Sequence, residues 1–160
     1  SNGTAALHLI SIAMKWKKGD IILTTPISFL ATSNSIVYSG ARPEFIDIDE
    51  NSYTIDVKKI EKKIKILKKN KKKIRAIIST DFAGHPCDWP QLRRIAKKYN
   101  LKLINDNCHS LGAAINFDKK YTSKYADFLV KIDINSKVES LNISNSAAIV
   151  FHHINKNKKN

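Results

Sequence analysis

The stretch that decides the fold runs from Leu101 to Gly112 and reads LKLINDNCHSLG. It begins with apolar residues, follows a charged helical segment and ends at Asp106, as expected for a buried parallel strand. His109 comes three positions later, and Gly112 allows the backbone to turn. Ligands of open α/β sheets bind beyond the carboxyl ends of the strands, so we expect a ligand site at Asp106 and His109. An aspartate here also serves as a turn or helix cap, so the stretch alone leaves a purely structural role open.

The composition is that of one globular domain with a strongly basic surface. The chain has 160 residues, 42% of them hydrophobic, and a formal net charge of +14 with a pI of about 9.8. Such a charge is typical of proteins that bind nucleic acids or membrane surfaces. The lysines, however, are spread over several expected helix faces, and the aromatic residues do not alternate with them as a base-stacking platform requires. We therefore expect no nucleic-acid partner. No apolar run is long enough to cross a bilayer, so no membrane association is expected either.

Two cysteines, Cys87 and Cys108, bear on the compartment and on metal binding. Thiols so far apart in the sequence make no disulfide framework, and no secretory signal is present at the start, so a cytoplasmic location is expected. The pairs His85/Cys87 and Cys108/His109 contain zinc-ligating groups, but their spacing matches no common zinc module. We expect no metal site.

Apolar periodicity alternates between strand and helix along most of the chain. The expected elements are a helix ending at Gly19, a strand over 21–25, a helix over 29–38 capped by Ser28, a strand over 44–49, a helix with Val57, Ile60, Ile64 and Leu67 on one face, a strand over 74–80, and a helix capped by Asp88 with Leu92, Ile95 and Ala96 facing inward. This order predicts an α/β fold with a mostly parallel sheet and helices on both faces. Strand-like runs recur at 126–130 and 146–151, but the pattern decays from Lys131 onward.

Two features near the start suggest a bound anion and a buried aromatic. Gly3 and Thr4 precede the first helix, where free backbone N–H groups and a hydroxyl form a natural anion site. As a motif this is weak, because Ser and Thr caps are common. Phe29 follows the first strand, and on its pattern alone it is a core aromatic.

Five segments, in this order and at these separations, resemble one known family. They are residues 1–7 (SNGTAAL), 29–34 (FLATSN), 45–49 (FIDID), 80–86 (TDFAGHP) and 106–112 (DNCHSLG). They are similar to the DegT/DnrJ/StrS family of sugar aminotransferases, which use pyridoxal phosphate on the aspartate-aminotransferase type fold. Segments 80–86 and 107–110 resemble most the UDP-4-amino-4,6-dideoxy-N-acetyl-altrosamine transaminase branch, on the pseudaminic acid route. The resemblance covers roughly residues 1–130.

The resemblance implies a role for each matching residue. Gly3 and Thr4 would hold the cofactor phosphate through helix-terminal N–H groups. Phe29 would stack on the pyridine ring, and Asp106 would pair with the protonated ring nitrogen, which keeps the ring an effective electron sink. His109 would lie beside the cofactor and help to position Asp106 or the ring, and we count it with the catalytic residues. The loop around the histidine at position 85 would lie near the sugar, without a specific contact assigned.

The resemblance weakens where the family has the lysine that binds the cofactor covalently. Counting from the Ala-Asp pair at 126–127, that lysine falls on Lys137. The serine and histidine expected before it are replaced by Ile132 and Ile134, and the Gly-Gly turn after it by residues 146–147. Lys137 is therefore the expected catalytic lysine, in a segment that looks degraded.

The expected organisation is that of an incomplete enzyme. Residues 1–130 would form a partial cofactor-binding large domain, residues 131–160 a degraded or divergent and partly disordered segment, and the small C-terminal domain would be absent. The implied activity of the complete enzyme is transfer of an amino group from glutamate to a 4-keto nucleotide-linked deoxysugar, in surface-glycan or pseudaminic acid biosynthesis. The full-length family forms homodimers with active sites between subunits, so this chain alone is expected to be inactive.

Two other functions stay open at this point. A non-catalytic scaffold or regulatory remnant of the same fold would explain the changed residues around Lys137. A basic nucleic-acid-binding domain would explain the charge and would show a strong salt-dependent affinity for generic DNA.

Overall fold

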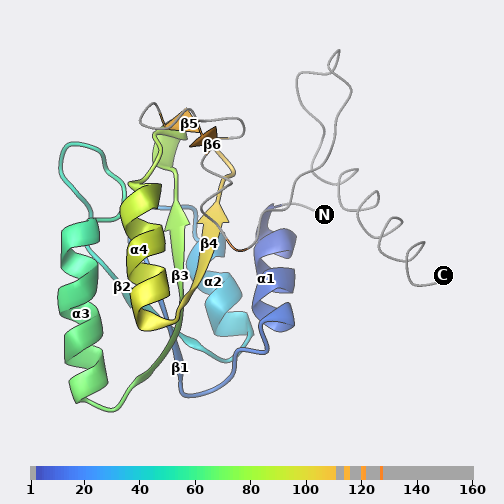
Figure 1. The fold of residues 1–160 in the computed structure, drawn as a ribbon. Helices are drawn as coiled ribbons and strands as arrows, with labels where there is room; N and C mark the ends of the chain where they lie inside the picture. The colour runs from blue at the N-terminus through green and yellow to red at the C-terminus, as the bar shows by residue number, and fades with distance from the viewer. Residues whose placement is uncertain (1–2, 111–113, 116–119, 122–126, 128–160) are drawn as a thin grey trace, which may run out of the picture.

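A four-stranded parallel sheet forms the centre of the fold (Figure 1). The computed structural model describes residues 3–110, 114–115, 120–121 and 127. The strands lie in the order β2-β1-β3-β4, so their carboxyl ends share one edge. Their bounds are β1 Asp20–Thr24, β2 Arg42–Phe45, β3 Lys73–Thr80 and β4 Lys102–Asp106. A separate antiparallel pair is formed by β5 Ala114–Ile115 and β6 Lys120–Tyr121.

Helices cover both faces of this sheet (Figure 1). One pair, α1 and α2, packs on one face, and the other pair, α3 and α4, packs on the opposite face. Their bounds are α1 Gly3–Ala13, α2 Ala31–Tyr38, α3 Val57–Lys69 and α4 Trp89–Tyr99, and a short 3-10 turn, η1 Phe82–Gly84, follows β3. The predicted α/β class, with a parallel sheet covered on both sides, is confirmed.

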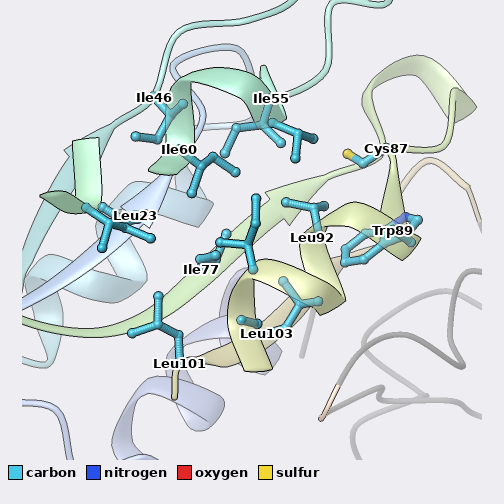
Figure 2. Close-up of a cluster of buried hydrophobic side chains, with 14 of the residues drawn as sticks. Leu23, Ile46, Ile55, Ile60, Ile77, Cys87, Trp89, Leu92, Leu101 and Leu103 are labelled. Carbon is cyan, nitrogen blue, oxygen red and sulfur yellow. The ribbon is translucent and has the colours of Figure 1, made fainter. Parts of the chain in front are cut away.

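The larger of two cores lies between the sheet and the α3/α4 pair (Figure 2). Leu23, Ile77 and Leu103 come from three adjacent strands, and Ile60 and Leu92 come from the two helices. All five side chains are completely buried. Each contributes about 1.5–3 kcal/mol through removal of its apolar surface from water.

The smaller core lies on the other face of the sheet. Ile22, Ile78 and Ile104, the strand neighbours of residues in the larger core, pack there with Ile36 of α2. Trp16, from the loop after α1, closes this cluster and is 5% exposed. Successive strand residues thus enter opposite cores, as the pleat requires.

One irregularity in β3 changes this alternation. Ile21 pairs with Ile74, whereas the next residue of β1 pairs with Ala76, so Arg75 is an extra residue in the ladder. Beyond a bulge of this kind, the side chains of the strand point toward the opposite face of the sheet from the one that strict alternation would give. As a result Ile74 and Ile77, although three positions apart, both pack on the larger core.

Aspartate residues cap both α3 and α4, and the sequence predicts the cap at Asp88. Asp56 caps α3 by accepting a hydrogen bond from the backbone N–H of Lys58, and Asp88 caps α4 by accepting one from that of Gln91. Such caps satisfy N–H groups that have no partner within the helix. Asn100 ends α4 with a left-handed φ of 54°.

The first helix is shorter than its sequence pattern suggests. The predicted end at Gly19 is wrong, because α1 ends at Ala13. Lys15 takes a left-handed φ of 53°, and this turn carries Trp16 back into the smaller core. Burial of that indole outweighs continuation of the helix. The lysines after Ala13 therefore belong to a loop and not to the last turn of the helix.

Two further boundaries are corrected by the structure. α2 begins at Ala31, and Ser28 does not cap it, because its hydroxyl donates to the carbonyl of Phe29. The strand expected over 44–49 is β2, which lies earlier and contains Pro43. Proline is tolerated there because β2 is an edge strand of the described sheet.

Several predictions fall outside the described residues. These are Lys137, Gly112, the strand over 146–151 and the degraded segment 131–160.

From the expected strand over 126–130 only Asp127 is described: its carboxylate accepts hydrogen bonds from the Leu103 N–H at 2.8 Å and from Arg93 Nη1 at 2.6 Å.

Replacement of Ile60 by alanine should lower the free energy of unfolding by about 2–5 kcal/mol, because the methyl groups removed leave a cavity in the larger core. The matched control is Ile66→Ala in the same helix, where the side chain is 48% exposed and a change within about 0.5 kcal/mol is expected. Urea unfolding measures both. Equal losses in the two variants would contradict the described packing of α3.

Candidate functional site

Asp106 lies at the carboxyl end of β4, on the sheet face covered by α1 and α2. Its side chain is buried, with 4% of the residue exposed. Its Oδ2 accepts hydrogen bonds from Thr32 Oγ1 of α2 at 2.6 Å and from Thr80 Oγ1 of β3 at 3.4 Å. A short hydrogen bond to an ionised acceptor is among the stronger ones in proteins. Two hydroxyl groups from two other elements therefore fix the orientation of this carboxylate.

The second carboxylate oxygen of Asp106 has a different environment. Oδ1 is buried and has no hydrogen-bond partner among the described residues. The hydroxyl of Thr24, at the end of β1, is also buried without a partner there. A charged group left with an unsatisfied buried oxygen costs about 1–3 kcal/mol or more. A ligand with a cationic N–H group would remove that cost by donating to Oδ1.

The start of α1 approaches the turn that follows Asp106. A Cβ atom added at Gly3 would lie 2.8 Å from Cys108 Sγ, closer than packed atoms allow. Cys108 is exposed as a residue, but its sulfur is turned toward α1 and Asp106. Partial burial of the sulfur, and then the neighbouring Asp106 carboxylate, raise the pKa of the Cys108 thiol to about 12. The N–H groups at the start of α1 thus lie beside the Asp106 turn.

Phe29 comes two residues before α2, and Thr4 lies in the first turn of α1. Phe29 is 72% exposed, so its interpretation as a core aromatic is wrong. Its backbone carbonyl accepts the N–H of Thr32 at 3.1 Å, so the Phe29 backbone is bonded to the residue that holds Asp106. Thr4 is half-buried in the first turn of α1. Both side chains remain accessible to a ligand.

His109 lies on the same turn as Cys108 and is exposed. Its ring meets the ring of Phe82 edge to face, with 6.4 Å between centroids. The hydrogen-bonding groups that hold Asp106 are the hydroxyls of Thr32 and Thr80. Reasoning from the sequence missed both threonines, because their spacing from Asp106 along the chain carries no signal.

A groove of about 730 Å³ lies apart from this cluster, between the starts of α3 and α4. Its lining includes His85 and three carboxylates, those of Asp49, Asp56 and Asp88. These carboxylates are occupied by nearby N–H groups in turns and helix caps. None of the residues predicted to hold the cofactor lines the groove. Its size therefore does not make it the functional centre.

Metal-binding clusters and membrane-spanning helices are both missing from the described part of the chain. Among residues 3–110 and the short described segments beyond them, no group of three or more His, Cys, Asp or Glu side chains is arranged to hold a metal ion. No helix in those same segments is long and apolar enough to cross a membrane.

Comparison with known proteins yields one consistent match. The model of the DegT/DnrJ/EryC1/StrS aminotransferase family matches residues 1–130. A UDP-4-amino-4,6-dideoxy-N-acetyl-beta-L-altrosamine transaminase of Campylobacter jejuni is 40% identical over 130 residues, covering 81% of this chain and 33% of the relative. A GDP-perosamine synthase of Escherichia coli O157:H7 is 35% identical over 127 residues, covering 79% of this chain and 33% of the relative.

A solved structure agrees with the sequence matches. The crystal structure of NtdA from Bacillus subtilis with bound cofactor PMP superimposes with a TM-score of 0.68 at 31% identity, over 79% of this chain and 26% of that one. The chain thus spans about a third of the length of the curated relatives that it matches.

The close approach of Gly3 to Cys108 predicts that substitutions at these two positions have coupled effects on stability. Gly3→Ala should destabilise the protein by about 1–3 kcal/mol, because the added methyl group overlaps the sulfur. In a Cys108→Ala background the same substitution should be neutral or slightly stabilising, since alanine is the better helix former. Thermal unfolding of the four proteins measures this coupling. Additive effects would mean that the turn does not touch α1.

Proposed function

Because this chain belongs to the DegT/DnrJ/EryC1/StrS aminotransferase family, we propose that it carries the pyridoxal phosphate half of a nucleotide-sugar aminotransferase site. The observation that carries the proposal is the carboxylate of Asp106, buried and ordered by Thr32, with Oδ1 lacking a donor among the described residues. A protonated pyridine nitrogen is a donor of the required charge. The bound cofactor PMP of the NtdA structure supports the choice of ligand.

The other predicted residues fit around the same position. Gly3 and Thr4 present backbone N–H groups and a hydroxyl at the start of α1, where a phosphate is stabilised by the helix dipole. Gly3 is needed there because a side chain would meet Cys108. Phe29 offers an exposed ring for stacking on an aromatic ligand, and His109 offers a second ring on the turn after β4.

Within this proposal each residue has a distinct task. Pyridoxal phosphate, when bound, supplies the electron sink needed for amino-group transfer. Asp106 holds the proton on the ring nitrogen, because a buried carboxylate beside that atom favours its cationic form. Thr32 and Thr80 keep the carboxylate turned so that Oδ1 stays free for the ligand. Lys137 is the proposed covalent attachment point and the group that moves protons at the reacting carbon.

The proposed substrates follow from the relatives. The Campylobacter jejuni relative is named for a UDP-linked amino-dideoxy sugar, and the Escherichia coli relative for GDP-perosamine. We assign this chain to an enzyme that aminates a 4-keto nucleotide-linked deoxysugar with glutamate as donor, in cytoplasmic synthesis of a surface polysaccharide. The identity with the first relative supports the altrosamine branch.

A homodimer is the proposed assembly of the complete enzyme. Four large apolar side chains are exposed on the adjacent helices α1 and α2, which are Leu9, Ile12, Val37 and Tyr38. Single exposed apolar residues are common on monomers, whereas several on two neighbouring helices favour an interface. A second subunit covering these helices would remove the four side chains from water.

Asp106→Asn should weaken saturable binding of pyridoxal phosphate by about 10- to 100-fold, since a charge-assisted hydrogen bond to the ring nitrogen is lost. The matched control is Asp47→Asn, an equivalent change at an exposed carboxylate paired with Lys59. Titration of the cofactor absorbance with each purified chain gives the affinities. Equal affinity of the Asp106→Asn variant and the unmodified chain would rule out this carboxylate as the ring partner.

Borohydride reduction of the chain with bound pyridoxal phosphate should place the label on Lys137. Lys137→Arg should abolish the labelled peptide, whereas Lys131→Arg should leave it unchanged. Peptide mapping by mass spectrometry resolves these sites. A label scattered over many lysines, unaffected by the substitution at position 137, would favour the second candidate, a non-catalytic scaffold. The changed residues Ile132 and Ile134 support that candidate.

A further inference from the structure

Asp81 is a buried carboxylate to which the proposed chemistry gives no role. Asp81 directly follows the last residue of β3, and Asp106 is the last residue of the neighbouring β4. Asp81 is 0% exposed. Its backbone N–H donates to the carbonyl of Asp106 at 3.4 Å, so the two strand ends are adjacent. A buried carboxylate is tolerated only when donors surround it.

Each oxygen of Asp81 accepts from a different part of the chain. Oδ1 accepts the backbone N–H of Cys87 at 2.9 Å and Trp89 Nε1 at 2.8 Å. Oδ2 accepts Ser110 Oγ at 2.9 Å and Asn105 Nδ2 at 3.4 Å. All four donors are neutral. One oxygen is therefore anchored to the segment that enters α4, and the other to β4 and the turn after it.

Ser110 closes the turn 107–110 from its far end. Its N–H donates to the carbonyl of Asn107 at 3.3 Å, and its hydroxyl also contacts the Asn107 side chain. A hydroxyl carries one hydrogen, and a carboxylate can only accept. The single Ser110 hydrogen is therefore within reach of two acceptors, Asp81 Oδ2 at 2.9 Å and Asn107 Oδ1, and Asp81 is the fully buried one of the two.

The same turn is confined from the side of η1. Gly84 has a left-handed φ of 83°, and a Cβ atom added there would lie 3.2 Å from the backbone oxygen of His109. The ring of Phe82 meets the ring of His109. The turn thus lies between η1 and α1. Through the Ser110 hydroxyl it donates a hydrogen bond to the fully buried Asp81 carboxylate.

We propose that Asp81 is a positioning residue that clamps the turn 107–110 to the sheet edge, and thereby fixes Cys108 and His109 relative to Asp106. The clamp has two arms, one to Cys87 and Trp89 and one to Ser110. Its effect on cofactor binding rests on the proposed function, whereas the clamp itself is a property of the free chain.

Cys108 reports on the clamp without any ligand. The chain has only two cysteines, and Cys87 is 1% exposed, so it serves as an internal reference. In the closed turn, burial and Asp106 keep the Cys108 thiol protonated at pH 8, because its pKa is about 12. Release of the turn returns the thiol toward its ordinary pKa and raises the thiolate fraction, which is the form that reacts.

The experiment measures iodoacetamide labelling of Cys108 at pH 8 by peptide mass spectrometry, in the full chain without cofactor. Ser110→Ala, which removes the turn-side arm, should raise the labelling rate at least about tenfold. Ser110→Thr, which keeps the hydroxyl, should restore the slow rate. Ser39→Ala is the matched control, because it removes a serine hydroxyl that donates to the Ile36 carbonyl at the end of α2, outside the clamp, and should change the rate less than about threefold.

Asp81→Asn gives an independent check on the same oxygen. The amide retains an acceptor for Cys87 and Trp89 but faces the Asn105 amide with a second donor, so Cys108 labelling should again increase. An unchanged rate in Ser110→Ala, or an equal increase in Ser39→Ala, would overturn the clamp.

A second measurement separates the clamp from the proposed function. If the chain binds pyridoxal phosphate, Ser110→Ala should weaken binding and change the circular dichroism of the cofactor band, and Ser110→Thr should restore both. Faster Cys108 labelling in a chain that never binds the cofactor would support the clamp and contradict the proposed function. Tight binding unaffected by Ser110→Ala, with unchanged labelling, would contradict the clamp and leave the proposed function standing.

Discussion

A parallel sheet joined by helical crossovers is covered on both faces, because each crossover carries a helix back across the sheet. In this protein that constraint produces two cores of alternate strand residues and aligns the carboxyl ends of the four parallel strands along one edge. The polar residues Thr24, Thr80 and Asp106 stand at that edge, each within two residues of the end of a buried apolar run. Strand ends that are distant in the sequence therefore meet at this edge. The hydroxyl of Thr32, carried by α2, is the fourth polar group there.

Two carboxylates at neighbouring strand ends illustrate how similar positions acquire different properties. Asp81 faces donors on all sides, so each oxygen is satisfied by neutral groups of the chain. Asp106 has donors on one oxygen only, among the residues that the structure describes. A fully satisfied buried carboxylate stabilises the fold around it, whereas a half-satisfied one is stabilised further by a ligand. The difference lies in which helix covers each strand end, and the local sequence does not encode it.

Features set by local pattern could be predicted from the sequence. The α3 and α4 stripes, the Asp88 cap and the buried strands were confirmed, since each depends on residues a few positions apart. The end of α1 was wrong because burial of Trp16 depends on strands far along the chain. Asp106 could be predicted as a site residue because it stands at the end of a buried strand. The positions of Thr32 and Ser110 along the sequence gave no indication that they contact these carboxylates. Their roles arise from contacts between elements, and a single sequence records no such contacts.

The strand order has a consequence for how the chain acquires its fold during synthesis. β1 is an inner strand, and Ile21 pairs both with Arg42 and with Ile74. One side of β1 can therefore be completed early, but the other side must wait until β3 has been made. At typical translation rates, synthesis from the end of β1 to the end of β3 takes on the order of 3–10 s. During this time the backbone amides and apolar side chains on one side of β1 lack their final neighbour. The lysine-rich α3 is made within that interval, and its positive charge favours the solubility of the incomplete chain.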